Sequence, residues 1–138
     1  MSSLWTKVNR NIPEILKRYR HIAVVGLSNK THRPSYQVSA YMKSNGYTIH
    51  PVNPNYDEVL GIKCVGSLKE IGQKIEIVDI FRRSEEVFPV VEEAIALNAR
   101  VIWMQLGVIN EDAARMALDA GLDVVMDRCI KIEYGSFY

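Results

Sequence analysis

The chain has 138 residues, 48% hydrophobic and 24% charged, which is ordinary for one globular domain with a substantial core. Basic and acidic side chains nearly balance at a net charge of +1, so bulk charge gives no reason to expect binding to nucleic acid or membranes. Two cysteines, Cys64 and Cys129, form neither a disulfide framework nor a zinc site. Without an apolar leader or a membrane-length segment, we expect a cytoplasmic protein.

We expect residues 1–138 to form one domain, with residues 1–20 as a helical extension that begins at a capping Asn11. Five strands are predicted, at residues 21–25, 47–52, 75–81, 100–105 and 122–126. Helices are predicted with Pro34 in the first turn, from about 84 to 97, and from a cap at Asn110 to Gly121. Pro89 is unfavourable inside the second of these, which indicates a start about one turn later. The tail, residues 130–138, has a mixed pattern.

Strands that alternate with helices predict a doubly wound, Rossmann-like α/β fold with a five-stranded parallel sheet covered on both faces. Right-handed crossovers permit the strand order 3-2-1-4-5, which we predict. Ligands of such sheets bind beyond the carboxyl ends of the strands, where the order reverses. The crevice is therefore expected between the first and fourth strands, with residues 26–34 and 105–110 as its walls.

The loop after the first strand, residues 26–34, is the first candidate site. It leads into a helix start, where unpaired N–H groups and a partial positive charge suit an anion. Gly26 permits a tight turn. The polar and cationic side chains that follow it are Ser28, Asn29, Lys30, Thr31 and Arg33. Because one glycine-containing turn is a weak signal, a solvated connecting loop is the alternative.

The features of an ordinary NAD site are missing. The loop lacks the second and third glycines of G-x-G-x-x-G, and the second strand ends without Asp or Glu. Asn53 and Pro54 stand there instead, and Pro54 and Tyr56 offer an apolar ledge that could cover an adenine. A proline-rigidified turn is the alternative interpretation.

Two later strand ends carry further candidates. Phe81, Arg82 and Arg83 follow the third strand, where guanidinium groups suit a pyrophosphate or a 3′-phosphate. Solvated cations beside neighbouring acids are the alternative. After the fourth strand, Gln105 can donate and accept hydrogen bonds and Gly107 permits a close approach, although a simple turn is equally compatible.

Cys129 follows the fifth strand beside Arg128, which could stabilise a thiolate, although an inert buried thiol is more common. The three histidines are too scattered for a nucleophilic triad, and no metal site is expected. A P-loop motif is absent. Asp79 falls within a predicted strand and is assigned a structural role.

Six short segments together resemble one family: residues 24–28, 33–36, 51–54, 79–82, 103–107 and 124–129. The family is that of the stand-alone CoA-binding domain proteins of bacteria and archaea, relatives of the N-terminal domain of the succinyl-CoA synthetase α subunit. The Trp-Met-Gln-Leu-Gly and Val-Met-Asp-Arg-Cys segments are specific to the stand-alone group. The resemblance extends over about residues 10–134.

The resemblance implies a fold that binds coenzyme A (CoA) or an acyl-CoA. The implied contacts fall on Ser28, Asn29, Lys30 and Thr31, on Tyr56, and on Met104, Gln105 and Leu106. The synthetase has a lysine where Tyr56 stands, so Arg82 or Arg83 is expected to supply that phosphate contact.

The phosphorylated histidine of the synthetase has no counterpart in the chain, so ligase activity is not expected. We expect a non-catalytic binding module that serves as a carrier, sensor or redox buffer. Alternatives are acyl transfer or CoA-disulfide chemistry at Cys129, and a diverged NAD(P)-binding domain. The expected partner is the small molecule, with neither nucleic acid nor membrane, and a homodimer or a protein partner is left open.

Overall fold

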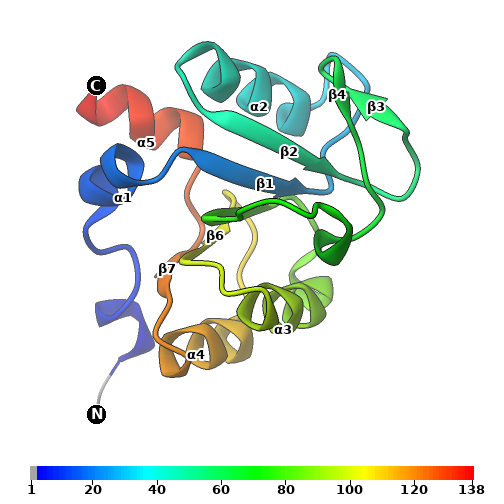
Figure 1. Ribbon diagram of the computed structural model, residues 1–138. Coiled ribbons are helices and arrows are strands. Elements are labelled where there is room, and N and C mark those ends of the chain that lie inside the picture. The colour runs from blue at the N-terminus through cyan, green and yellow to red at the C-terminus, as the bar shows by residue number, and fades with distance from the viewer. Residues whose placement is uncertain (1–2) are drawn as a thin grey trace.

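The computed structural model describes residues 3–138, in which a five-stranded parallel sheet lies between two layers of helices (Figure 1). The strands are β1 His21–Val25, β2 Thr48–Val52, β5 Ile77–Ile80, β6 Val101–Met104 and β7 Asp123–Val125. One face is covered by α1 Ile12–Arg18, α2 Pro34–Ser44 and α5 Ile130–Phe137. The other face is covered by α3 Val87–Ala96 and α4 Glu111–Asp119.

The five predicted strands are confirmed, each a little shorter than or equal to its predicted range. Every residue of β5 and β6 is buried, because helices cover both faces of a parallel sheet. Apart from Asp79, these strands are apolar throughout. The apolar runs therefore mark the centre of the sheet, as the sequence predicts.

The strand order differs from the predicted 3-2-1-4-5, which is wrong. The third predicted strand, β5, pairs with β1 and not with β2, so that Val78 lies opposite Ala23. The observed order, β2-β1-β5-β6-β7, is 2-1-3-4-5 in the terms of the prediction, and right-handed crossovers permit it equally. The order therefore reverses between β1 and β5, and the crevice lies there rather than between the first and fourth strands.

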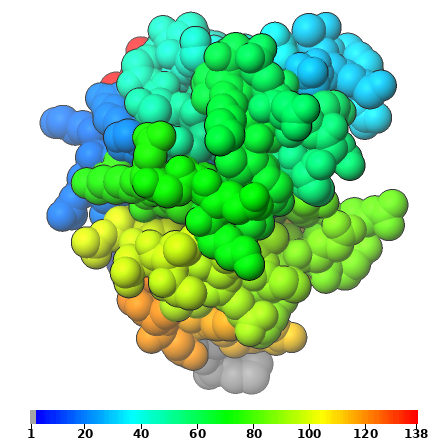
Figure 2. All heavy atoms as spheres, turned by 45° about the vertical axis from the view of Figure 1, so that its right-hand side comes forward, coloured from blue at the N-terminus to red at the C-terminus, as the bar shows by residue number. Residues whose placement is uncertain are grey.

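Pro51 explains why β2 lies at the edge of the sheet. Proline has no N–H to donate, so a strand that contains it is restricted to an edge. On its outer side β2 meets only the chain that leads to β5, where the Val65 N–H donates to the Pro51 carbonyl at 3.2 Å. Figure 2 shows this connection, in green, lying across the face of the molecule between α2 and the yellow-green residues of α3.

Of the two predicted helix caps, one is confirmed and one is wrong. The Asn110 side chain caps α4 by accepting from the Ala113 N–H at 2.9 Å, as expected. Asn11 does not cap α1 with its side chain, because its backbone is left-handed (φ 58°). Residues 130–137 of the mixed tail form α5, and a small hairpin of β3 Glu58–Val59 and β4 Ile62–Lys63 follows the proline-containing turn after β2.

Single turns of 3-10 helix complete the described chain at η1 Leu4–Thr6, η2 Leu68–Glu70 and η3 Ser84–Glu86. The last of these leads directly into α3, so Pro89 falls in the first turn, as expected. Within residues 3–138, no helix has the length and apolar character needed to cross a membrane.

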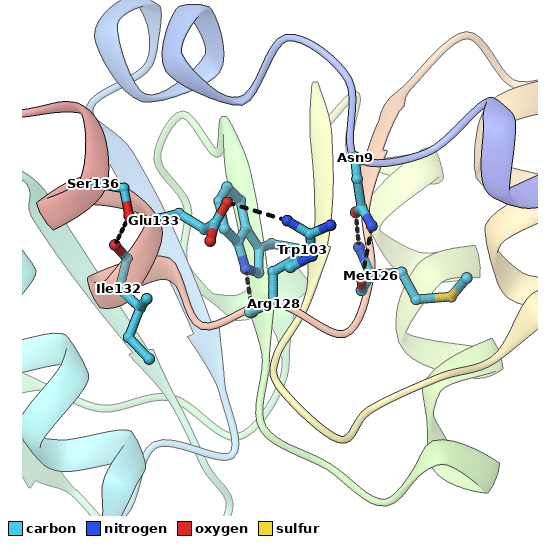
Figure 3. Close-up of polar contacts among 7 residues, drawn as sticks. All are labelled: Asn9, Trp103, Met126, Arg128, Ile132, Glu133 and Ser136. Carbon is cyan, nitrogen blue, oxygen red and sulfur yellow. Dashed lines mark hydrogen bonds and ion pairs between the residues drawn. The ribbon is translucent and has the colours of Figure 1, made fainter.

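The N-terminal segment protects the other edge of the sheet. The side-chain amide of Asn9 makes two hydrogen bonds with the backbone of Met126, as a neighbouring strand would. Nδ2 donates to the Met126 carbonyl at 3.1 Å, and Oδ1 accepts from the Met126 N–H at 2.7 Å (Figure 3). Its backbone N–H donates to the Val124 carbonyl at 2.8 Å. The Val124 carbonyl of β7 and both backbone polar groups of Met126, directly after the strand, are thereby paired rather than left open.

Candidate functional site

A pocket of about 580 Å³ lies beyond the carboxyl ends of β1, β5 and β6. This is where ligands bind in doubly wound sheets, and the size is within the range of small-molecule sites. Its walls are Gly26, Ser28, Lys30, Arg33, Pro34, Ser35, Val38, Tyr56, Phe81, Arg82, Arg83, Gln105, Leu106, Val108, Cys129 and Ile132.

Gly26 allows the first loop to approach the loop after β5. Its backbone has φ +87°, and a Cβ built on it would lie 2.2 Å from the Phe81 carbonyl oxygen. Its N–H donates to the Val52 carbonyl at 2.8 Å, which also ties it to β2. Only glycine satisfies both the backbone conformation and the contact, so the residue fixes the geometry at the point where the strand order reverses.

The first loop is held by its own polar groups. The Ser28 N–H donates to the Ser35 hydroxyl at 3.0 Å, and the Lys30 N–H donates to the Ser28 hydroxyl at 3.0 Å. Arg33 precedes α2 in an extended conformation and its side chain does not cap the helix. Arg33, Pro34 and Ser35 also line the pocket, so the positive end of the α2 dipole borders it.

Four cationic side chains line the pocket: Lys30, Arg33, Arg82 and Arg83. Its lining, within the part of the chain that the structure describes, contains no Asp or Glu. The Arg82 guanidinium lies 3.7 Å from the Glu86 carboxylate. Such an exposed i,i+4 ion pair contributes little free energy, so a ligand phosphate could take the place of the carboxylate. The electrostatic character of this wall favours an anion with more than one negative group.

Another part of the lining is apolar and carries a thiol. Leu106 and Ile132 are 65% and 58% exposed, respectively, and both border the pocket beside the half-buried Cys129. The Arg128 guanidinium points to Glu133 at 3.5 Å, and the Arg128 carbonyl accepts from Trp103 Nε1 at 2.8 Å (Figure 3). The buried Trp103 thus anchors the segment that carries Cys129.

Gln105 lies at the buried end of the pocket and has a carboxyl group behind it. Its side-chain Nε2 donates to Asp79 Oδ1 at 2.7 Å, and the two residues are 3% and 1% exposed. Burial raises the pKa of Asp79 to about 7, against the opposing effect of the Gln105 hydrogen bond. This carboxyl group therefore titrates near neutral pH.

Several residues predicted for the site lie outside the pocket lining: Asn29, Thr31, Asn53, Pro54, Met104 and Gly107. Asn53 instead donates to the Leu27 carbonyl at 3.1 Å and so braces the first loop from β2. Met104 is fully buried in the core, and the Gly107 N–H donates to Asp127 Oδ1 at 2.7 Å. These three support the loops rather than face the cavity.

Five lining residues were not among the candidate binding residues, namely Pro34, Ser35, Val38, Val108 and Ile132, although Pro34 and Val108 lie within the predicted walls of the crevice. Ile132 comes from α5, which the sequence analysis left without a structure. A signal was present, because Ile130 and Tyr134 are four residues apart and both pack on the same core as α1 and α2.

The histidines do not contribute to the pocket lining. His21 and His50 stack on each other with Nδ1 and Nε2 3.0 Å apart, and burial, assisted by His21, lowers the pKa of His50. No group of three or more potential metal ligands occurs among residues 3–138.

Comparisons with known proteins agree with the fold. The uncharacterized protein YneT of Bacillus subtilis is 50% identical over 123 residues, covering 89% of this chain and 91% of that protein. The structure of a hypothetical protein from Pyrococcus horikoshii superimposes with a TM-score of 0.90 at 42% identity, over 92% of this chain and 89% of that one.

An ADP-forming acetate–CoA ligase II of Archaeoglobus fulgidus is 33% identical over 63 residues, 44% of this chain but only 9% of the ligase. The family model described as a CoA binding domain matches residues 20–135. With its parallel sheet, its reversal of strand order at β1 and β5, and this match over most of its length, the chain belongs to the CoA binding domain family.

Proposed function

We propose that the protein binds CoA or an acyl-CoA in this pocket, as a non-catalytic binding or sensor module. The observation that carries the proposal is the convergence of four cations and the start of α2 on one pocket without an acidic lining residue. CoA carries a diphosphate and a 3′-phosphate, which require such a surface. Membership of the CoA binding domain family supports the same ligand.

The two walls suggest how the ligand would lie. The diphosphate would meet the first loop, where Lys30 and Arg33 adjoin the start of α2, and Arg82 and Arg83 would take the 3′-phosphate. The pantetheine arm would then follow the apolar wall beside Leu106 toward Cys129. A dinucleotide such as NAD is a weaker candidate, since no acid ends β2 and Asn53 there is engaged with Leu27.

Calorimetric titration with CoA, dephospho-CoA and NAD tests the proposal. CoA is expected to bind more tightly than dephospho-CoA, and the R82Q/R83Q double variant should lose at least about tenfold in affinity for CoA, since even one charge-assisted contact contributes about 1.5–3 kcal/mol. Dephospho-CoA should be nearly unaffected by the same substitutions. The matched control is R100Q, because Arg100 is exposed and lies directly before β6, at the amino end of the strand and away from the pocket.

The titrations test separately the identity of the ligand, the role of the two arginines and the NAD alternative. No heat with CoA at millimolar concentration would remove CoA as the ligand. Equal losses for CoA and dephospho-CoA in R82Q/R83Q would show that these arginines do not read the 3′-phosphate. Tighter binding of NAD than of CoA would favour the dinucleotide alternative.

A second candidate function is thiol exchange with CoA disulfide, favoured by the position of Cys129 in the pocket lining. The Cys129 thiolate would attack one sulfur of the disulfide, form a protein–CoA mixed disulfide and release one CoA thiolate. Intact-mass measurement after incubation with CoA disulfide should show one CoA adduct that disappears in C129S. C64S is the control, because burial raises the pKa of the Cys64 thiol; an adduct that persists in C129S excludes the reaction.

A further inference from the structure

Asp79 is a buried carboxyl group to which the proposed function assigns no role. It stands in β5 with Val24 of β1 on one side and Trp103 of β6 on the other, and it is 1% exposed. Within residues 3–138, no Lys, Arg or His nitrogen lies within 4.0 Å of its carboxylate. A buried carboxyl group without a cation is unfavourable, which calls for a reason beyond packing.

Its hydrogen-bond partner is the Gln105 amide, which lines the pocket. In its ionised form, which Asp79 takes above about pH 7, the carboxylate only accepts hydrogen bonds, and the Gln105 amide turns its Nε2 toward it in a contact of 2.7 Å. The carbonyl end of the same planar amide then faces elsewhere. No group of the described chain donates a hydrogen bond to Gln105 Oε1. This oxygen is therefore an unused acceptor on a residue that lines the pocket and is only 3% exposed.

We propose that Asp79 is a positioning residue, which fixes the Gln105 amide so that its carbonyl oxygen accepts a hydrogen bond from the bound ligand. The ligand group must be a donor: an N–H, O–H or S–H. Without Asp79, the amide could offer its NH₂ end instead, which opposes a donor. This inference rests on the proposed function, because it concerns the ligand of the same pocket. In CoA such donors occur in both the adenosine half and the pantetheine half.

Four variants test the arrangement by calorimetry with CoA at about pH 8, where Asp79 is ionised. D79L removes the acceptor that orients the amide, and Q105L removes the amide; each should weaken CoA binding by about tenfold, the value of one hydrogen bond. D79N should stay within about threefold of the wild type, because the Asn oxygen can still accept from Nε2. The D79L/Q105L double variant should bind no more weakly than Q105L.

Adenosine 3′,5′-bisphosphate, which lacks pantetheine, identifies the donor. If D79L weakens this ligand as much as CoA, the donor lies in the nucleotide half; if only CoA is affected, it lies in the pantetheine half. An unchanged CoA affinity in D79L would overturn the proposal. The proposal would also be overturned if D79L weakened CoA binding by the same factor in Q105L as in the wild type, because Asp79 would then act independently of the amide.

An NMR signal tests the contact without a ligand. The Gln105 side-chain NH₂ resonances, identified by their loss in Q105L, should titrate with pH in the wild type and not in D79N. If these resonances did not change with pH in the wild type, the proposal that Asp79 orients the amide would be overturned. This test does not require D79L to fold. If the wild type binds no CoA, the proposed function falls, and the NH₂ titration still decides whether Asp79 orients Gln105.

Discussion

Gly26 and Gly46 form a matched pair at the scale of single residues. Both have a left-handed backbone, with φ +87° and +92°, but a Cβ at Gly26 would lie 2.2 Å from a backbone oxygen, whereas nothing lies within 4 Å of one at Gly46. The contact of the first loop with Phe81, and not the turn alone, therefore requires glycine at position 26.

We predict that G46A loses about 1–2 kcal/mol of unfolding free energy from its backbone conformation alone. G26A should lose about 4 kcal/mol or more, since the Phe81 backbone must also move. Urea unfolding of the two variants measures the difference. Equal losses would mean that the close approach of the two loops does not constrain the fold.

Asp79 makes stability depend on pH. Its pKa is about 7 in the folded state, against 3.8 for a free Asp, so the folded protein keeps a proton that the unfolded chain releases. The free energy of unfolding contributed by this group is therefore greatest below about pH 4, falls as the pH rises to about 7, and is then constant.

D79N cannot lose a proton and should escape this fall. We predict that it is more stable than the wild type at about pH 8, by an amount on the order of 4 kcal/mol, and that the difference shrinks toward about pH 4. Chemical denaturation of both proteins across this range provides the measurement. A constant difference at every pH would show that Asp79 has an ordinary pKa in the folded protein.

At the scale of elements, the edge strands show what the sequence pattern could and could not predict. The apolar runs located all five strands, but alternation and handedness are the same for the orders 3-2-1-4-5 and 2-1-3-4-5. The feature that distinguishes them is Pro51, which restricts β2 to an edge. The short helix α5 was missed because Gly135 interrupts its pattern, and its packing against α1 and α2 supplies the stability that local propensity lacks.

The other edge depends on Asn9. We predict that N9A destabilises the protein by about 1–3 kcal/mol, because it leaves the Met126 N–H and carbonyl unpaired. N9D retains an acceptor for the N–H and should be the less damaging of the two if that bond dominates. Thermal and urea unfolding compare them, and CoA affinity should be unchanged in both. If N9A had the same free energy of unfolding as the wild type, water would replace the hydrogen bonds of the side chain without loss of stability.

At the scale of the whole molecule, the pocket collects residues from loops that are far apart in the chain. Strand ends were predictable sites, so Gly26, Arg82 and Gln105 were found from the sequence. Helix residues such as Val38 and Ile132 were not, because their part in the wall depends on how α2 and α5 pack. The corrected order also places Phe81 beside Gly26, which brings both cationic loops to one cavity.

The most direct test of the account is an NMR titration of the labelled protein with CoA, following backbone amide shifts. We predict the largest changes around the pocket, at Gly26, Ser28 and Arg82, and little change at His21 and Arg100, which lie at the amino ends of β1 and β6, away from the pocket. Shifts centred on the amino ends of the strands, or none at millimolar CoA, would contradict the assignment of this pocket as a CoA site.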